Sequence, residues 1–131
     1  MVQEPRITPF SDFVDIHQVN TIPIGETRTI FFFQVPESCR AFIDKIGNTD
    51  FVGARHEFKI DGQIVETQIA REVGLVNKPA IIDPPYYVRS TIEWITQNSG
   101  TALMTQEVLI DGLLYHHAEW KALQKISPTG Y

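Results

Sequence analysis

The residues of this sequence that could do chemistry are histidines, aspartates, one cysteine and a few clustered aromatic side chains. The histidines are the first candidates for a metal site, because imidazole is a common metal ligand. They are His17, His56, His116 and His117. His116 and His117 are neighbours, and neighbours on a strand point to opposite faces, so they would not share one metal ion. We therefore expect surface or core-edge histidines and no metal site.

Two aspartates, Asp61 and Asp111, could act as the acid and base of a hydrolase or as calcium ligands. Each is followed by glycine and lies between segments of alternating hydrophobicity. Asp-Gly in this setting is the strongest short signal for a β-hairpin, because both central residues of a type I′ turn need positive φ. The turns account for both residues. We expect two hairpins, at Asp61-Gly62 and Asp111-Gly112, without a catalytic role.

Cys39 is the only cysteine, so no intramolecular disulfide can form. As a nucleophile it would need a base, and its sequence neighbours supply none, whereas a lone cysteine in an alternating strand is usually a small core residue. The sequence contains no Gly-rich phosphate loop, no Gly-x-Ser-x-Gly and no His-Glu-x-x-His. We predict no enzyme, no catalytic residue and no cofactor.

Four aromatic residues, Tyr86, Tyr87, Trp94 and Trp120, could form a platform on which a sugar stacks. Trp94 is better explained by core packing beside Ile92. Tyr86 and Tyr87 follow two prolines, which favours an exposed contact. If Tyr86, Tyr87 and Trp120 converged in an exposed groove, the chain would be a carbohydrate- or receptor-binding module, and this is the main alternative to the function expected below.

Length and composition limit the classes of protein. A chain of 131 residues suits one domain. The net charge of −5 and the absence of a Lys/Arg cluster argue against nucleic acid as a partner. The N-terminus has an acidic residue and a proline where a signal peptide needs an apolar stretch, and no run approaches ~18 apolar residues. We expect no membrane association and no export by that route.

Strand signals dominate the sequence. Thr27–Val35 is β-branched and aromatic and is expected to be covered on both faces. The other strands are expected at 39–46, 57–60, 63–66, 88–97, 103–110 and 113–115, with weaker ones near 13–19 and 80–82. Trp120, Leu123 and Ile126 are spaced by three, which favours a short C-terminal helix. The prediction is an all-β chain that forms an antiparallel, jelly-roll-like β-sandwich.

Residues 1–25 are expected to form an extended N-terminal arm, and residues 26–131 a single sandwich domain. An internal repeat divides that domain into two similar β units, 36–66 and 85–115. Its matched positions are Pro36, Arg40 and Ile43 with Pro85, Arg89 and Ile92, and Ile60-Asp61-Gly62 with Ile110-Asp111-Gly112. The alternative is a chance match, since β sequences share turn chemistry.

Three stretches resemble small β-sandwich accessory proteins of tailed bacteriophage virions, of the decoration, fibre or connector type. They are IGETRTI at 24–30, VPESCRAFIDKIGN at 35–48 and KIDG at 59–62, within a resemblance that covers about residues 24–115. The chain departs from that pattern because no glycine follows Val35-Pro36. The resemblance implies a structural part of a viral particle, a capsid-decorating or head/tail accessory protein assembled in the host cytoplasm. Its partners would be major capsid or head/tail subunits and further copies of itself.

The candidate contact residues lie in the arm and after the double proline. They are Phe10, Phe13, Val14, Ile16, Tyr86 and Tyr87. The apolar residues of the arm are too few and too interrupted by proline to form their own core, so they would be ordered only against another surface. That surface is either the chain's own domain or a neighbouring subunit. A third class of function, a small β-barrel enzyme or metal-binding barrel, would be revealed by metal analysis.

Overall fold

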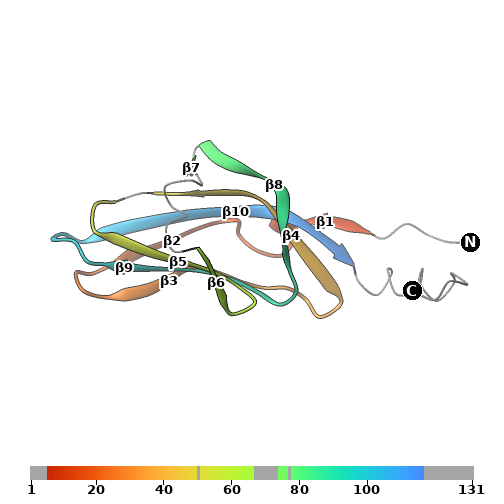
Figure 1. The fold of residues 1–131 in the computed structure, drawn as a ribbon, viewed down its shortest axis with the longest axis horizontal. Coiled ribbons are helices and arrows are strands. Elements are labelled where there is room, and N and C mark those ends of the chain that lie inside the picture. The colour runs from red at the N-terminus through yellow and green to blue at the C-terminus, as the bar shows by residue number, and fades with distance from the viewer. Residues whose placement is uncertain (1–5, 50, 67–73, 77, 117–131) are drawn as a thin grey trace, which may run out of the picture.

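The computed structural model describes residues 6–49, 51–66, 74–76 and 78–116. These residues form two antiparallel sheets that face each other (Figure 1). No helix in this part of the chain is long and apolar enough to cross a bilayer. The predicted all-β, antiparallel sandwich is confirmed.

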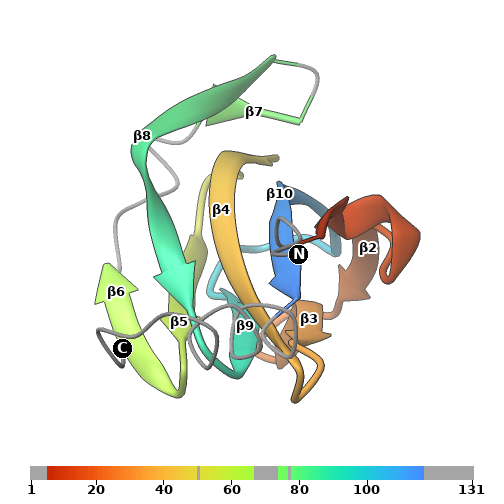
Figure 2. The same ribbon diagram turned by 90° about the vertical axis from the view of Figure 1, so that its right-hand side faces the viewer.

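The first sheet has six strands, in the order β1-β10-β4-β8-β7, with β2 also paired to β10. Their bounds are β1 (Ile7–Pro9), β2 (His17–Ile22), β4 (Cys39–Asn48), β7 (Gly74–Leu75), β8 (Lys78–Val88) and β10 (Met104–His116). β2 pairs with the first half of β10, and β1 pairs with its end. Figure 2 shows β8 running beside β4 at one side of this sheet.

The second sheet has four strands, in the order β3-β9-β5-β6. Their bounds are β3 (Thr27–Gln34), β5 (Ala54–Ile60), β6 (Gln63–Glu66) and β9 (Thr91–Asn98). With β1 and β7 set aside, the chain pairs first with last and second with second-to-last: β2 with β10, β3 with β9, β4 with β8 and β5 with β6. This nesting of eight strands over two sheets is the jelly-roll topology that the sequence predicted.

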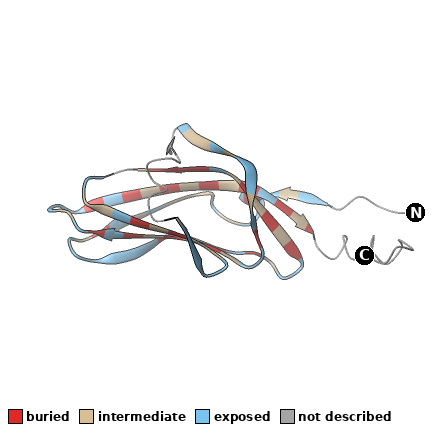
Figure 3. Ribbon diagram, viewed as in Figure 1, coloured by how far each residue is buried: buried red, intermediate tan, exposed pale blue. Residues whose placement is uncertain are grey.

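Strict alternation of side chains builds the core between the sheets. In β10, every second residue from Met104 to His116 is buried (Figure 3). Trp94, Phe31 and Phe58 are fully buried from the other sheet. β3 is covered on one face and not on both, because Phe32 is 47% exposed. Trp94 belongs to the core, as its spacing predicted.

Of the two predicted Asp-Gly hairpins, one is confirmed and one is wrong. Asp61 and Gly62 have φ values of 55° and 81° and connect β5 to β6. Asp111 and Gly112 instead lie inside β10, at a β-bulge. Glycine is required there by close approach, since a Cβ on Gly112 would collide with the carbonyl oxygen of Phe42.

Two other predicted elements differ in their bounds. The arm contributes β1, a 3₁₀ turn at Phe10–Asp12 (η1) and β2 to the sandwich of its own chain, so its described residues dock in cis. The strand expected at 88–97 is divided, because the chain turns at Arg89 and Ser90 between β8 and β9. The predicted helix at 118–126 lies outside the described residues.

The residues of the proposed repeat lie in different sheets. Ile43 is in β4 of the six-stranded sheet, and Ile92 is in β9 of the four-stranded sheet. The interpretation as two similar β units remains a prediction.

Candidate association surface

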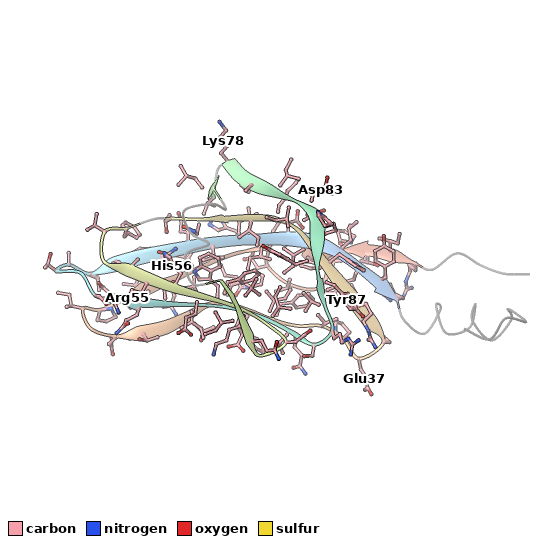
Figure 4. All side chains as sticks on the ribbon, in the orientation of Figure 1. Glu37, Arg55, His56, Lys78, Asp83 and Tyr87 are labelled. Atoms are coloured by element: carbon pink, nitrogen blue, oxygen red, sulfur yellow. The ribbon has the colours of Figure 1, made fainter. Side chains whose placement is uncertain are left out.

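The described histidines lie on three different strands, and no group of three or more His, Cys, Asp or Glu in the described ranges could hold a metal. His56 lies in the core, where its Nδ1 is 2.9 Å from the Thr96 hydroxyl and accepts a 3.3 Å hydrogen bond from the Trp94 indole (Figure 4). His17 is in β2, with its Nε2 3.4 Å from the Glu107 carboxylate. His117 lies outside the described residues.

The fold brings Cys39 and His116 together, a contact that reasoning from sequence neighbours missed. The Cys39 Sγ is 3.7 Å from His116 Nδ1, because β10 and β4 pair directly at these residues. That nitrogen also accepts a 3.0 Å hydrogen bond from the Arg6 guanidinium, and Nε2 lies 2.8 Å from the Thr8 hydroxyl. Cys39 is 1% exposed, so a substrate would not reach its sulfur. The Cys39–His116 contact joins β4 to β10, and the Thr8–His116 contact fastens β1 to β10.

Three aspartates, Asp44, Asp61 and Asp111, interact with neighbouring groups of the fold. Although partial burial raises the pKa of Asp61, hydrogen bonds from the backbone N–H groups of Ser90, Arg89 and Thr91 and from the Ser90 hydroxyl outweigh it, and the pKa is lowered. Partial burial, and then the nearby Asp111 carboxylate, raise the pKa of Asp44. Asp111 accepts a 2.8 Å hydrogen bond from the N–H of Gly112 within the bulge. Asp61 thus belongs to the β5–β6 turn, and Asp111 belongs to the bulge in β10.

Apolar and aromatic side chains gather on the outer face of the six-stranded sheet. The register places Phe42 opposite Leu113 on one side and opposite Tyr87 on the other. Tyr115 and Ile7 form the next row across the sheet. We call Ile7, Phe42, Tyr87, Leu113 and Tyr115 the outer aromatic surface. All five side chains are exposed or half-buried.

The rings of this surface contact one another across three strands. Phe42 lies between Tyr87 and Tyr115, with ring centroids 5.3 Å and 5.2 Å apart. Such pairs stabilise an antiparallel sheet and fix its register. Tyr87 is nevertheless 42% exposed, and it points out from β8 (Figure 4). The rings therefore contact one another while part of their area stays open to solvent.

Two arginines border the outer aromatic surface. The Arg89 guanidinium lies over the Tyr87 ring, 5.9 Å from its centroid, and Arg40 donates to the carbonyl of Cys39 at 3.0 Å. Within the described part of the chain, neither arginine forms an ion pair. The surface thus combines exposed aromatic area with two arginines that no described carboxylate pairs, on a chain whose net charge is −5.

The six predicted contact residues do not form one site. Phe10 is fully buried in the core, and Val14 and Ile16 pack against that core. Phe13 is 48% exposed at the end of η1. Tyr86 turns inward, 6.1 Å from the Phe58 ring, while Tyr87 turns outward. Phe13 and Tyr87 therefore remain available for contact.

An open groove of about 540 Å³ lies beside this region. Its lining residues are Ile60, Asp61, Gln63, Ile64, Val65, Tyr86, Tyr87 and Arg89. Tyr86 and Tyr87 reach it from opposite faces of β8, so they do not form a flat stacking platform. Trp120, the third residue of the predicted sugar platform, lies outside the described residues.

Comparison with known proteins finds resemblance at the level of structure. No family model matches the chain, and no curated protein matches it. One solved structure similar to it is the infectious bursal disease virus VP2 subviral particle, with 16% sequence identity and a TM-score of 0.46. The alignment covers 93% of this chain and 35% of that chain, so this chain spans about a third of that protein's length.

Proposed function

We propose that this chain is a non-enzymatic structural component of a viral particle and that it acts by protein–protein association through the outer aromatic surface. In finer detail, it is a capsid-decorating or head/tail accessory protein of the tailed-bacteriophage kind. Its partners are then major capsid or head/tail subunits, and it resides in the virion after assembly in the host cytoplasm.

The observation that carries this proposal is the outer aromatic surface. Protein interfaces are enriched in tyrosine, phenylalanine and arginine, and a few such residues at their centre supply most of the binding energy. Here Phe42, Tyr87 and Tyr115 are held in contact before any partner arrives, which lowers the entropy cost of association. A contiguous apolar area on a small domain is typical of a binding site.

The jelly-roll topology is compatible with this role but does not define it. Jelly rolls recur in viral capsid proteins, in lectins and in cupins, so a function has to be argued from the site. Among the described residues, the side chains that could do chemistry are each engaged in a turn, in the core or in fastening a strand. Association is the role that the exposed residues support.

The experiment is to purify viral particles on a density gradient from a culture that carries this gene. Mass spectrometry should find the chain in the particle fractions. A culture carrying Tyr87→Ala should leave most of the chain at the top of the gradient, because the variant loses the exposed ring. Phe32→Ala, which removes a phenyl of similar exposure from the other sheet, is the matched control and should stay with the particle. Absence of the wild-type chain from the particle would overturn the proposal.

A carbohydrate- or receptor-binding module is the second candidate, favoured by the groove beside Tyr86 and Tyr87. Sugars bind by stacking on aromatic rings and by hydrogen bonds to polar groups, which Gln63 and Arg89 offer there. A glycan array probed with the purified chain tests this function. Binding of a defined glycan that Tyr86→Phe preserves and Tyr87→Ala abolishes would favour this candidate over structural association.

A further inference from the structure

We propose that the partner seated on the outer aromatic surface is a second copy of this chain, which inserts Phe13 and places Asp12 and Asp15 beside Arg40 and Arg89. This inference rests on the proposed function, because it names the occupant of the same surface. It adds that the contact is head-to-tail, with different residues on the two copies.

The inserted element is a phenyl group between two carboxylates. Phe13 ends the 3₁₀ turn η1 and is 48% exposed, although its backbone N–H is fixed to the carbonyl of Phe10 at 2.9 Å. Asp12 and Asp15 are exposed on either side of it. In the described part of the chain neither carboxylate forms an ion pair, and Asp15 accepts only local hydrogen bonds such as that from the His17 N–H. We call Asp12, Phe13 and Asp15 the acidic knob.

The receiving element has the complementary chemistry. Phe42 and Tyr87 offer aromatic area, and Arg40 and Arg89 offer positive charge that no carboxylate of the described chain neutralises. An apolar side chain flanked by carboxylates fits such a surface, because each charge gains a partner at the rim while the ring is buried at the centre. With a net charge of −5, two copies repel each other on average, and pairing the acidic knob with Arg40 and Arg89 opposes that repulsion.

The two elements lie at different places in the fold. The acidic knob follows β1, whereas Tyr87 lies in β8, two strands beyond β10 in the order β1-β10-β4-β8. One copy can therefore donate its knob and receive another at the same time. A contact of this kind is heterologous, and repeated copies close into a ring or continue as an open array, as the parts of a particle do.

Sedimentation velocity of the full chain over a range of concentrations tests the inference. The wild-type chain should self-associate, and Phe13→Ala and Tyr87→Ala should each weaken self-association by about tenfold or more. Phe32→Ala is the control, because Phe32 is 47% exposed but lies on the outer face of β3. Raising the salt concentration should also weaken the contact, since its rim is ionic.

The decisive step is to mix the two defective variants. Phe13→Ala keeps an intact receiving surface, and Tyr87→Ala keeps an intact knob, so an equimolar mixture should form heterodimers at concentrations where each variant alone is monomeric. If Tyr87→Ala does not fold by circular dichroism, Arg89→Ala replaces it, because the backbone N–H of Arg89 that binds Asp61 is retained.

Three results would overturn the inference. The first is a wild-type chain that stays monomeric at every soluble concentration. The second is a mixture of the two variants that does not associate. The third is a Phe32→Ala variant whose self-association is weakened as much as that of Phe13→Ala. If, in any of these cases, the Tyr87→Ala chain is still lost from the particle fractions in the gradient experiment, the proposed function stands and the partner is a different virion protein.

Discussion

Asp61 and Ser90 join the ends of two turns that belong to different parts of the chain. The Asp61 carboxylate accepts a 2.7 Å hydrogen bond from the backbone N–H of Ser90 and a 3.2 Å bond from its hydroxyl. The same carboxylate accepts the N–H groups of Arg89 and Thr91. The β5–β6 hairpin is thereby fastened to the β8–β9 turn. This link lies beside Tyr87 of the outer aromatic surface and beside Arg89 at its border.

Asp61→Asn should lower the free energy of unfolding at pH 7 by about 1 kcal/mol, because a charged acceptor is replaced by a weaker neutral one on a solvent-screened site. The pKa of Asp61 is lowered in the folded state, so its stabilising effect is present above the unfolded value of about 3.9 and is lost as the pH falls through the folded value. Denaturant titrations at pH 7 and pH 3 check this, and a difference between wild type and variant that does not shrink at pH 3 would contradict it.

The two Asp-Gly pairs show how far the sequence could predict the fold. Both have the composition of a hairpin turn, but only Asp61-Gly62 takes positive φ. In the structure, burial alternates from Met104 to His116 and continues through Gly112. The sequence does not show this period of two, because apolar residues occupy both phases at 108–110 and 113–115. What the sequence could not show is the reason for Gly112, since Phe42 is far away in the sequence and meets it only after β4 and β10 have paired.

Gly112→Ala and Gly62→Ala should therefore have different effects. The Cβ added by Gly112→Ala would strike the Phe42 carbonyl and the Phe10 ring, so we expect a loss of about 3 kcal/mol. At Gly62 nothing lies within 4 Å, and only the φ of 81° is strained, which costs about 1 kcal/mol. Thermal unfolding of both variants measures the contrast. Equal losses would mean that the glycine in β10 is not closely packed.

The pKa of Asp44 should fall in the Asp111→Asn variant, because one of the two causes that raise it is removed while partial burial remains. A raised folded pKa means that Asp44 favours the folded state below the unfolded pKa and that this contribution is lost as the pH rises through the folded value. Asp111→Asn should therefore reduce the loss of stability as the pH rises from the unfolded to the folded pKa of Asp44. NMR titration of the Asp44 carboxyl group is the measurement, and an unchanged midpoint would rule out the coupling.

Phe10→Ala should cost about 3–5 kcal/mol, the usual range for a fully buried phenylalanine. The side chain is 0% exposed and its ring is 5.3 Å from Phe33, across the sandwich. Phe13→Ala, in the same turn, should change stability little. Chemical denaturation of both variants checks this contrast. A small effect at Phe10 would show that the arm does not belong to the core.

Sequence reasoning found only part of the outer aromatic surface. Tyr87 was predicted to be exposed because two prolines precede it, although the physical cause is its outward position on β8. Phe42 and Tyr115 were missed, although both fall on the outward phase of strands whose inward residues are mostly apolar. Their meeting depends on the register of β10, β4 and β8, which are distant in the sequence, and alternation alone does not specify which strands pair.

If the chain is part of a viral particle as proposed, a cryo-electron microscopy map of that particle should show what contacts the outer aromatic surface. A neighbouring subunit should cover Phe42, Tyr87 and Leu113 on the outer face of the six-stranded sheet, with a carboxylate beside Arg89. A map in which that face is open to solvent, and the chain is held through another surface, would contradict it.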